Sequence, residues 1–246
     1  MYLIIGRAED SFCQAIQNRL RAAGQGCFIL AELFHAPGRA GVTISDCGVS
    51  VQCQSAAGDW LDGNHVSGVY VRELVYPDVS FWSPADYDYV TQEVTSSFLS
   101  WLASLPCSVL NRYDPRTWSM RYSSVLAWRL SARRCGLEVY DRWGKTDGLS
   151  SQLRLYRVAA IDQELVWDLI PPSDHEQLRK PLRLFMELNR VVILEAVFNF
   201  ELGRSQLFSI SLELCPERFS PTTKQQILEK IVVLLLRSSK TTIRSR

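Results

Sequence analysis

The sequence has no long apolar run, no strong net charge and no clustered cysteines or histidines. No apolar stretch reaches the roughly 18 residues that a membrane-spanning helix needs, and the N-terminal MYLIIGRAED has no basic segment before an apolar one. We therefore expect a cytoplasmic protein that makes no contact with a membrane. The net charge of +1 provides no electrostatic attraction to nucleic acid, so we expect no nucleic-acid partner.

Common catalytic and metal-binding motifs are also missing. The seven cysteines form no CxxC pair, and this odd number in a chain of 246 residues predicts reduced, mostly buried thiols. The three histidines are far apart in the sequence, which predicts no metal site. Gly144-Lys145-Thr146 lacks the preceding glycine of a phosphate-binding loop, because Val139 stands at that position. A GxSxG serine elbow is absent as well.

The first half of the chain alternates apolar runs with amphipathic segments. Residues 2–6 form a short apolar run, and residues 12–20 then carry apolar side chains at helical spacing. Later strands are expected to end near Leu74 and Asn111, each followed by a helix. This alternation predicts a mainly parallel α/β domain at residues 1–142. Three β-rich stretches, CFILAEL, GVTIS and VSVQC, lie within it.

After Gly148 the pattern changes to paired strands. LRLYRVAAI and LVWDLI form one predicted hairpin, and VILEAVFNFE and QLFSISLEL form another. Helices at residues 176–188 and 224–236 are expected to back the resulting antiparallel sheet. The predicted fold class is thus α/β followed by α+β. The expected divisions after residue 142 are a linker at 143–152, a C-terminal domain at 153–238 and a frayed basic tail at 239–246.

The last predicted strand ends at an acidic residue. LFSISLELCPERF, from Leu207 to Phe219, alternates apolar and polar residues as far as Glu213 and stops at Cys215-Pro216. A solvated strand end is one interpretation of Glu213. A binding role is the other.

The order of elements resembles the ATP-grasp superfamily. The resemblance rests on VLN before a helix that ends in GL, then YRVAAI, a helix, and a hairpin that ends in Glu-x-x-Pro. The branch that it resembles most is that of ligases which add amino acids to peptides or macrocyclise them. The resemblance implies that Arg157 faces nucleotide phosphates. It also implies a magnesium site of Asp on one strand and Glu-x-Asn on the other, positions that fall on Asn199, Glu213 and Cys215.

The departures from this family pattern are large. Asn199 lacks the charge of Asp, and Cys215 offers sulfur where magnesium requires oxygen. The family carries a nucleotide-covering lobe between the strands matched by LEVYDRW and LRLYRVAAI, whereas about ten residues of linker stand there in this chain. We therefore expect a reduced ATP-grasp-like sheet with no catalytic residues, no metal and no cofactor.

Two functional hypotheses follow, with a plain structural role as a third. The first is a non-catalytic ATP-grasp-like protein that serves as a binding, scaffold or regulatory subunit for a peptide or for a catalytically complete partner. The second is an ATP-dependent carboxylate-amine ligase, using ATP and magnesium, that another subunit completes. The candidate binding residues are Arg72 and Asn111 in the N-terminal domain and Arg157, Asn199 and Glu213 in the C-terminal one. Their ordinary roles would be ion pairs for the arginines and a helix cap for Asn111.

A partner chain is also expected from the apolar strands of the C-terminal sheet. Some apolar residues of these strands should face the site that a nucleotide and its covering lobe would otherwise fill. We expect the protein's own side chains or a second chain, either another copy or a complete relative, to cover it. The apolar residues concerned are Val197, Phe198, Phe200, Phe208 and Ile210.

Overall fold

The computed structural model divides the chain into two compact units. The first comprises Met1–Pro115 with Ile231–Arg246, and the second comprises Arg116–Lys230. Helix α6 (Pro221–Thr242) crosses the second division. The residues that the structure describes are 1–30, 40–45, 48–54, 60–72, 83–110, 125–140, 155–169, 175–201, 204–211 and 214–242.

The first unit contains the predicted parallel sheet, in the order β2-β1-β6-β7. All residues of β1 are buried, which explains its continuous apolar run. Helix α1 ends at Ala22, and Gly24 follows with a φ of +73°, the left-handed conformation that favours glycine after a helix. The elements are β1 (Tyr2–Ile5), α1 (Ser11–Ala22), β2 (Cys27–Leu30), β6 (Gly68–Val71), α2 (Tyr87–Ser104) and β7 (Ser108–Leu110).

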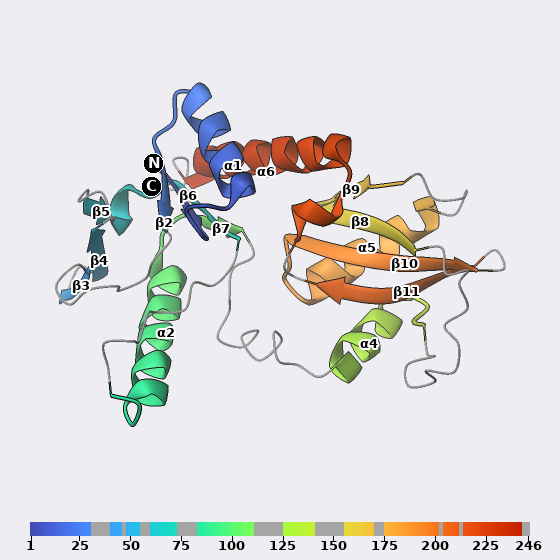
Figure 1. Ribbon diagram of the computed structural model, residues 1–246, viewed down its shortest axis with the longest axis horizontal. Helices are drawn as coiled ribbons and strands as arrows, with labels where there is room; N and C mark the ends of the chain where they lie inside the picture. Colours follow the sequence, from blue (N-terminus) through green and yellow to red (C-terminus); the bar gives the residue numbers. More distant parts are fainter. Residues whose placement is uncertain are drawn as a thin grey trace. The chain divides into compact units, whose positions relative to one another are not determined.

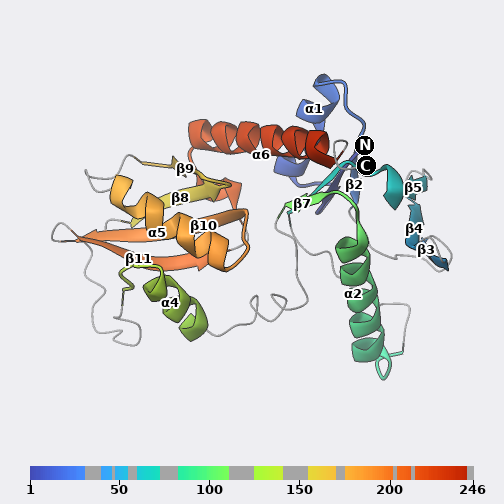
Figure 2. The same cartoon turned by 180° about the vertical axis from the view of Figure 1, so that it is seen from behind.

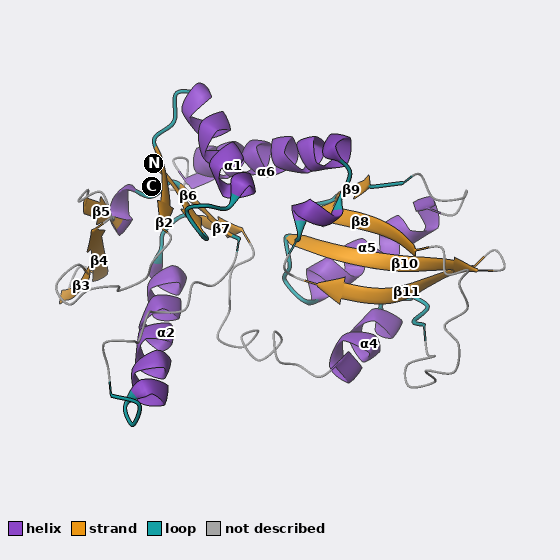
Figure 3. Cartoon of the chain, viewed as in Figure 1, coloured by secondary structure: helices purple, strands orange, loops and turns teal. Residues whose placement is uncertain are grey.

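A small antiparallel sheet lies in the chain between β2 and β6. It has the order β3-β4-β5, and Ala40 pairs with Cys53 at one end of the register. Figure 3 shows these strands apart from the parallel sheet. Two of the β-rich stretches of the sequence, GVTIS and VSVQC, thus form a hairpin. The elements are β3 (Ala40–Ser45), β4 (Gly48–Gln54), β5 (Trp60–Asp62) and the 3₁₀ turn η1 (Gly63–His65).

The second unit contains the predicted antiparallel sheet, in the order β11-β10-β8-β9. Both hairpins form as expected, and a register shift interrupts the second one between Val197 and Phe198. The fold class predicted from the sequence, α/β followed by α+β, is confirmed. The elements are α4 (Val125–Arg134), β8 (Leu155–Ile161), β9 (Glu164–Trp167), α5 (His175–Leu188), β10 (Ile193–Glu201), β11 (Arg204–Ser211) and the 3₁₀ turn η2 (Pro216–Arg218).

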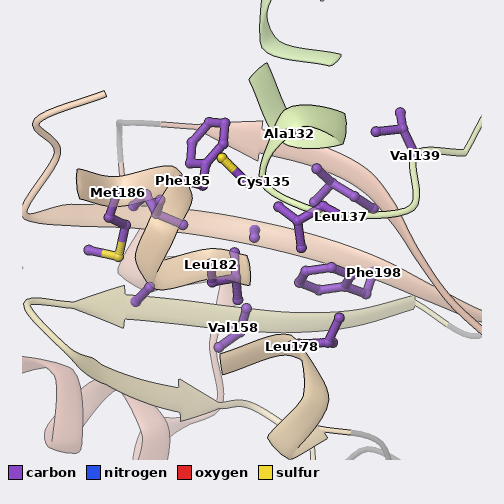
Figure 4. Close-up of a cluster of buried hydrophobic side chains, with 14 residues drawn as sticks. Ala132, Cys135, Leu137, Val139, Val158, Leu178, Leu182, Phe185, Met186 and Phe198 are labelled. Carbon is purple, nitrogen blue, oxygen red and sulfur yellow. The ribbon is translucent and has the colours of Figure 1, made fainter. Parts of the chain in front are cut away.

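Helices α4 and α5 supply the core on one face of this sheet. Figures 1 and 2 show α5 lying across the strands from the two opposite directions of view. Phe185 packs near Trp128 of α4 with ring centroids 5.3 Å apart. The buried residues of this core include Ala132, Cys135, Leu137, Val139, Val158, Leu178, Leu182, Phe185, Met186, Ala196, Phe198 and Leu207, most of which are labelled in Figure 4.

Residues that precede the predicted linker pack with the second unit. The backbone N–H of Tyr140 donates to Leu207 O at 2.9 Å, and that of Leu207 donates to Glu138 O at 2.6 Å. The segment after α4 therefore lies alongside β11, and the apolar side of α4 is buried in the same core. The sequence analysis places the boundary at 142, whereas packing places it near 115, because α4 buries its apolar face against the second sheet.

Helix α6 has buried residues on both sides of the division between the units. Ile227 and Leu228 belong to the second unit, Ile231 and Leu235 belong to the first, and all four are buried. Leu235 lies beside Gly68 of β6, where an added Cβ would come within 3.6 Å of its Cδ2. Among the described helices, none is long and apolar enough to cross a membrane.

Candidate functional site

One face of the antiparallel sheet is apolar, and the other carries a group of polar side chains beside buried apolar ones such as Ala159 and Val166. Side chains alternate along a strand, and Val158, Ala196 and Phe198 belong to the core under α4 and α5. Their strand neighbours therefore point to the opposite side of the sheet. We call that side the polar face, because it carries Arg157, Glu195, Asn199, Gln206, Ser209 and Ser211.

Glu195 is a buried carboxylate on the polar face, with 2% of its side chain exposed. Its Oε1 accepts a hydrogen bond from Arg157 Nε at 2.9 Å and lies 3.6 Å from Arg218 Nη1. Its Oε2 accepts from the backbone N–H of Cys215 at 3.0 Å. Both oxygens thus have donors, as a buried carboxylate requires.

Arg157 fastens the segment after β11 to the sheet. Its Nη1 donates to Arg218 O at 2.7 Å, and its guanidinium carbon lies 5.7 Å from the ring centroid of Phe219. The backbone continues this connection, because Asp168 N donates to Arg157 O at 3.0 Å. Asp168 Oδ1 in turn accepts from Ser220 N at 2.6 Å. Arg157 thereby joins β8, β10 and η2 through one side chain.

Asn199 lies away from this arrangement, near the turn of the hairpin. It pairs with Leu155 on one side and Gln206 on the other. Four residues of strand, about 13 Å, separate it from Glu195. Asn199 is 1% exposed, and its Nδ2 has no hydrogen-bond partner among the residues that the structure describes. The residue next to Cys215 is therefore Glu195, and Asn199 is not brought to that strand end.

Glu195 is the site residue that the sequence analysis missed. It opposes Ser211, two residues before Glu213, and the hairpin pairing begins at Glu201 and Arg204. Counting residues along both predicted strands, starting from the predicted turn, would have placed Glu195 opposite the end of the second strand. Matching the family motif along the sequence alone led instead to Asn199.

The other predicted site residues have mixed outcomes. Glu213 and Asn111 lie outside the described residues, so their roles stay predictions. Arg72 lies at the end of β6, and its Nε is 3.2 Å from Asp10 Oδ2, with both side chains largely buried. Asp10 Oδ1 also caps α1 by accepting from Phe12 N at 2.7 Å. Arg72 thus has the carboxylate partner of its ordinary role, and a ligand-binding role stays a prediction.

The residues at this strand end do not fit a magnesium ion. Magnesium binds oxygen ligands, commonly carboxylates, in near-octahedral geometry. Both Glu195 oxygens already accept from nitrogen donors, and Cys215 would offer sulfur. The described part of the chain contains no group of three His, Cys, Asp or Glu residues that could hold a metal ion.

The apolar residues of this sheet were expected to be covered by the protein's own side chains or by a second chain, and the described residues show side chains of the protein itself around most of them. Phe198 is in the core, and Phe200 and Ile210 pack against it from the helix-covered face. Val197 is buried, and Phe208 lies beside Tyr140 with ring centroids 5.7 Å apart. Strand alternation directs most of these residues toward the helices, whereas Val197, which pairs with Arg157, points to the opposite face and is buried there. Coverage by a second chain stays a prediction.

Comparison with solved structures identifies the fold. No protein-family model and no curated protein matches the sequence. Solved structures match over nearly the whole chain. The RiPP-associated ATP-grasp ligase of Chryseobacterium gregarium, in complex with ADP and a leader and core peptide, gives a TM-score of 0.74 at 10% identity, over 96% of each chain. The chain has the ATP-grasp fold.

Two further solved structures support this assignment. The macrocyclase MdnC of Microcystis aeruginosa, bound to precursor peptide MdnA, gives a TM-score of 0.74 at 13% identity, over 96% of this chain and 99% of that one. The RimK domain ATP-grasp protein of Sphaerobacter thermophilus gives a TM-score of 0.55 at 9% identity. The resemblance to ATP-grasp peptide ligases that the sequence suggested is therefore confirmed at the level of the fold. The interval expected to lack the covering lobe, residues 143–152, lies outside the described residues.

Proposed function

We propose that this protein is a non-catalytic member of the ATP-grasp fold that binds a peptide, as a binding, scaffold or regulatory subunit. The observation that carries the proposal is that the buried Glu195 carboxylate already pairs with Arg157 through one oxygen and accepts from the Cys215 N–H through the other. The peptide part rests on solved structures of the same fold, which include complexes with a leader and core peptide and with precursor peptides.

The absence of catalysis is supported by what ligase chemistry requires. Activation of a carboxylate by ATP relies on magnesium and cationic side chains to neutralise the transferred phosphoryl charge. A buried glutamate held by guanidinium groups is poorly suited to bind that ion. The sequence also offers only residues 141–154 between the segment beside β11 and β8, which is too short for a covering lobe.

The alternative function is an ATP-dependent carboxylate-amine ligase that another subunit completes. One observation favours it: the ligase PsnB, solved with a minimal precursor, magnesium and ADP, matches this chain with a TM-score of 0.73 at 14% identity. Under this alternative, a second ATP-grasp chain would supply the missing metal ligands and phosphate contacts. The partner would then be a catalytically complete relative.

Peptide binding and ADP formation together separate these functions. The purified chain is titrated calorimetrically with peptides encoded beside its gene, and ADP is measured with peptide, ATP and magnesium present. We expect peptide binding and no ADP from the chain alone. ADP formation by the chain alone would overturn the proposal, and so would failure of every such peptide to bind. ADP that appears only when a neighbouring ATP-grasp protein is added, and that needs this chain, would establish the alternative.

A further inference from the structure

Three exposed leucines lie on the side of α4 and α5 that faces away from the antiparallel sheet. Leu130, Leu184 and Leu188 are 48%, 46% and 58% exposed. The two helices lie side by side here, because Asn189 Nδ2 donates to Ser131 Oγ at 3.0 Å, and Leu130 and Leu188 directly precede these two residues. We call the three leucines and the helix surface around them the leucine face. Exposed apolar side chains that gather in this way are typical of an interaction site.

The leucine face is positively charged. Helices α4 and α5 together carry six arginines and lysines but two glutamates. Arg134 follows Leu130 by one helical turn, and Lys180 precedes Leu184 by one turn, so each cation neighbours a leucine on the helix surface. Both cations are exposed. The leucine face therefore combines apolar area with positive charge, and a partner that fits it needs apolar side chains with carboxylates beside them.

A surface of that kind lies on α2, in the first unit. The C-terminal half of this helix is buried through residues such as Phe98, whereas Tyr87 and Tyr89 at its start are 49% and 67% exposed. Figures 1 and 2 show the start of α2 extending away from the parallel sheet. Residues 83–110 contain no lysine, arginine or histidine. We call residues 86–93 the acidic end of α2. Its exposed charged residues are Asp86, Asp88 and Glu93.

We propose that two copies of this chain form a dimer in which the acidic end of α2 of each copy docks on the leucine face of the other. The acidic end supplies carboxylates and tyrosine rings, and the leucine face supplies cations and apolar area. Contact between two like surfaces would bring charges of one sign together, which disfavours that arrangement. Exchange of the same contact in both directions closes a two-fold dimer and doubles the buried area. The inference goes beyond the proposed function and does not rest on it, because neither surface includes Glu195.

The first test is the mass of the purified full chain, measured by light scattering across a dilution series. We expect a dimer with twice the 28.0 kDa of one chain. Added salt should make the dimer dissociate more readily, because it screens the opposite charges that meet at the contact. A mass of one chain at every concentration would overturn the inference and would leave these surfaces to a partner other than a second copy.

Charge reversal at either surface should weaken the dimer. The first variant combines Arg134→Glu with Lys180→Glu on the leucine face. The second combines Asp88→Lys with Glu93→Lys on α2. Each should raise the dissociation constant about tenfold or more, because like charges then meet at the contact. Arg204→Glu is the control: it reverses an exposed charge at the start of β11, outside both surfaces, and should leave the dimer intact. Equal dissociation constants for the control and both variants would exclude these surfaces as the interface.

A mixture of the two variants tests the pairing itself. The first variant has acidic residues at both surfaces and the second has basic residues at both, so one copy of each again brings opposite charges together at both contacts. We expect the mixture to form a mixed dimer at concentrations where each variant alone is a monomer, which a misfolded variant would not do. A mixture that stays monomeric would show that the two surfaces do not bind each other and would overturn the inference. Because no peptide or nucleotide is used, failure here is distinct from failure of the proposed function.

Discussion

Arg157 Nε donates to Glu195 Oε1 across 2.9 Å, from a side chain that is 30% exposed to one that is 2% exposed. The contact joins β8 to β10 on the polar face of the antiparallel sheet. Arg157 also reaches the backbone of Arg218, so the same side chain fixes the segment after β11. Removing either partner therefore has unequal consequences, because one is buried and the other is partly solvated.

Arg157→Met should destabilise the protein by about 3 kcal/mol, since it leaves a buried carboxylate with weaker compensation. The value lies at the low end for a broken buried pair because Arg218 and the Cys215 N–H still face Glu195. Urea unfolding measures the change, and Arg204→Met is the control, because Arg204 is exposed at the start of β11; its expected change is within about 0.5 kcal/mol. Equal stabilities of the two variants would mean that Glu195 does not depend on Arg157.

Leu182→Ala on α5 should cost about 3 kcal/mol, whereas Leu184→Ala on the same helix should cost well under about 1 kcal/mol. Leu182 is 0% exposed in the core under the sheet, and Leu184 is 46% exposed. The two substitutions delete the same atoms from one helix, so helix propensity cancels. Chemical unfolding gives both values. A similar cost at the two positions would contradict the packing of α5 against the sheet.

Local periodicity predicted the elements well because it records which side chains are buried. Phe12, Ile16 and Leu20 recur at helical spacing, and all three are fully buried on α1. The two hairpins were predicted from strand alternation and turn residues for the same reason. Each of these patterns is confined to one segment, so it can be recognised without knowing which other segment covers it.

The domain boundary and the site depended on contacts between distant segments. Nothing in the amphipathic pattern of α4 states which sheet it covers, and the structure places it with the second. Asn199 was assigned by its position in a motif, but cross-strand register decides which residue lies near Cys215, and it selects Glu195. A register shift at Val197 adds one residue to the count, which a motif read along the sequence does not include.

Asp10 should tolerate Asn better than Ala. Its Oδ1 accepts from Phe12 N at 2.7 Å and from Cys13 N at 3.2 Å, and its Oδ2 pairs with Arg72. Asp10→Asn keeps the cap oxygen and loses the charge, while Asp10→Ala loses both. We expect Asp10→Ala to cost about 2 kcal/mol and Asp10→Asn about half of that in thermal or urea unfolding. If the two variants are equally stable, the cap contributes nothing and the ion pair accounts for the whole effect.

Cys27 should be unreactive near neutral pH. Burial raises the pKa of its thiol to about 11, partly offset by Arg21 and by its hydrogen bond with the Phe28 backbone. Iodoacetamide at pH 8, followed by mass spectrometry, should modify half-buried Cys215 before Cys27.

Between pH 9 and 11 the folded state keeps the proton on Cys27 that the unfolded chain releases. The free energy of unfolding should therefore fall with rising pH, by about 1 kcal/mol at pH 10. Cys27→Ala should lose that component, and faster labelling of Cys27 than of Cys215 would contradict the burial argument.

ATP should not bind more tightly when magnesium is added. Magnesium in nucleotide sites is commonly held by carboxylates and substrate phosphates. Glu195 already accepts from Arg157 and Cys215, so coordination of the ion would compete with a buried ion pair. Magnesium also neutralises part of the triphosphate charge, which reduces the attraction of ATP to Arg157 and Arg218. Exposed phosphate contacts are further screened at physiological salt, where the Debye length is about 8 Å. Calorimetry with ATP at that salt, with EDTA and then with magnesium, checks the sign of the effect. A dissociation constant in the low micromolar range that appears only with magnesium would show that the chain holds the metal, and would favour the ligase over the non-catalytic function.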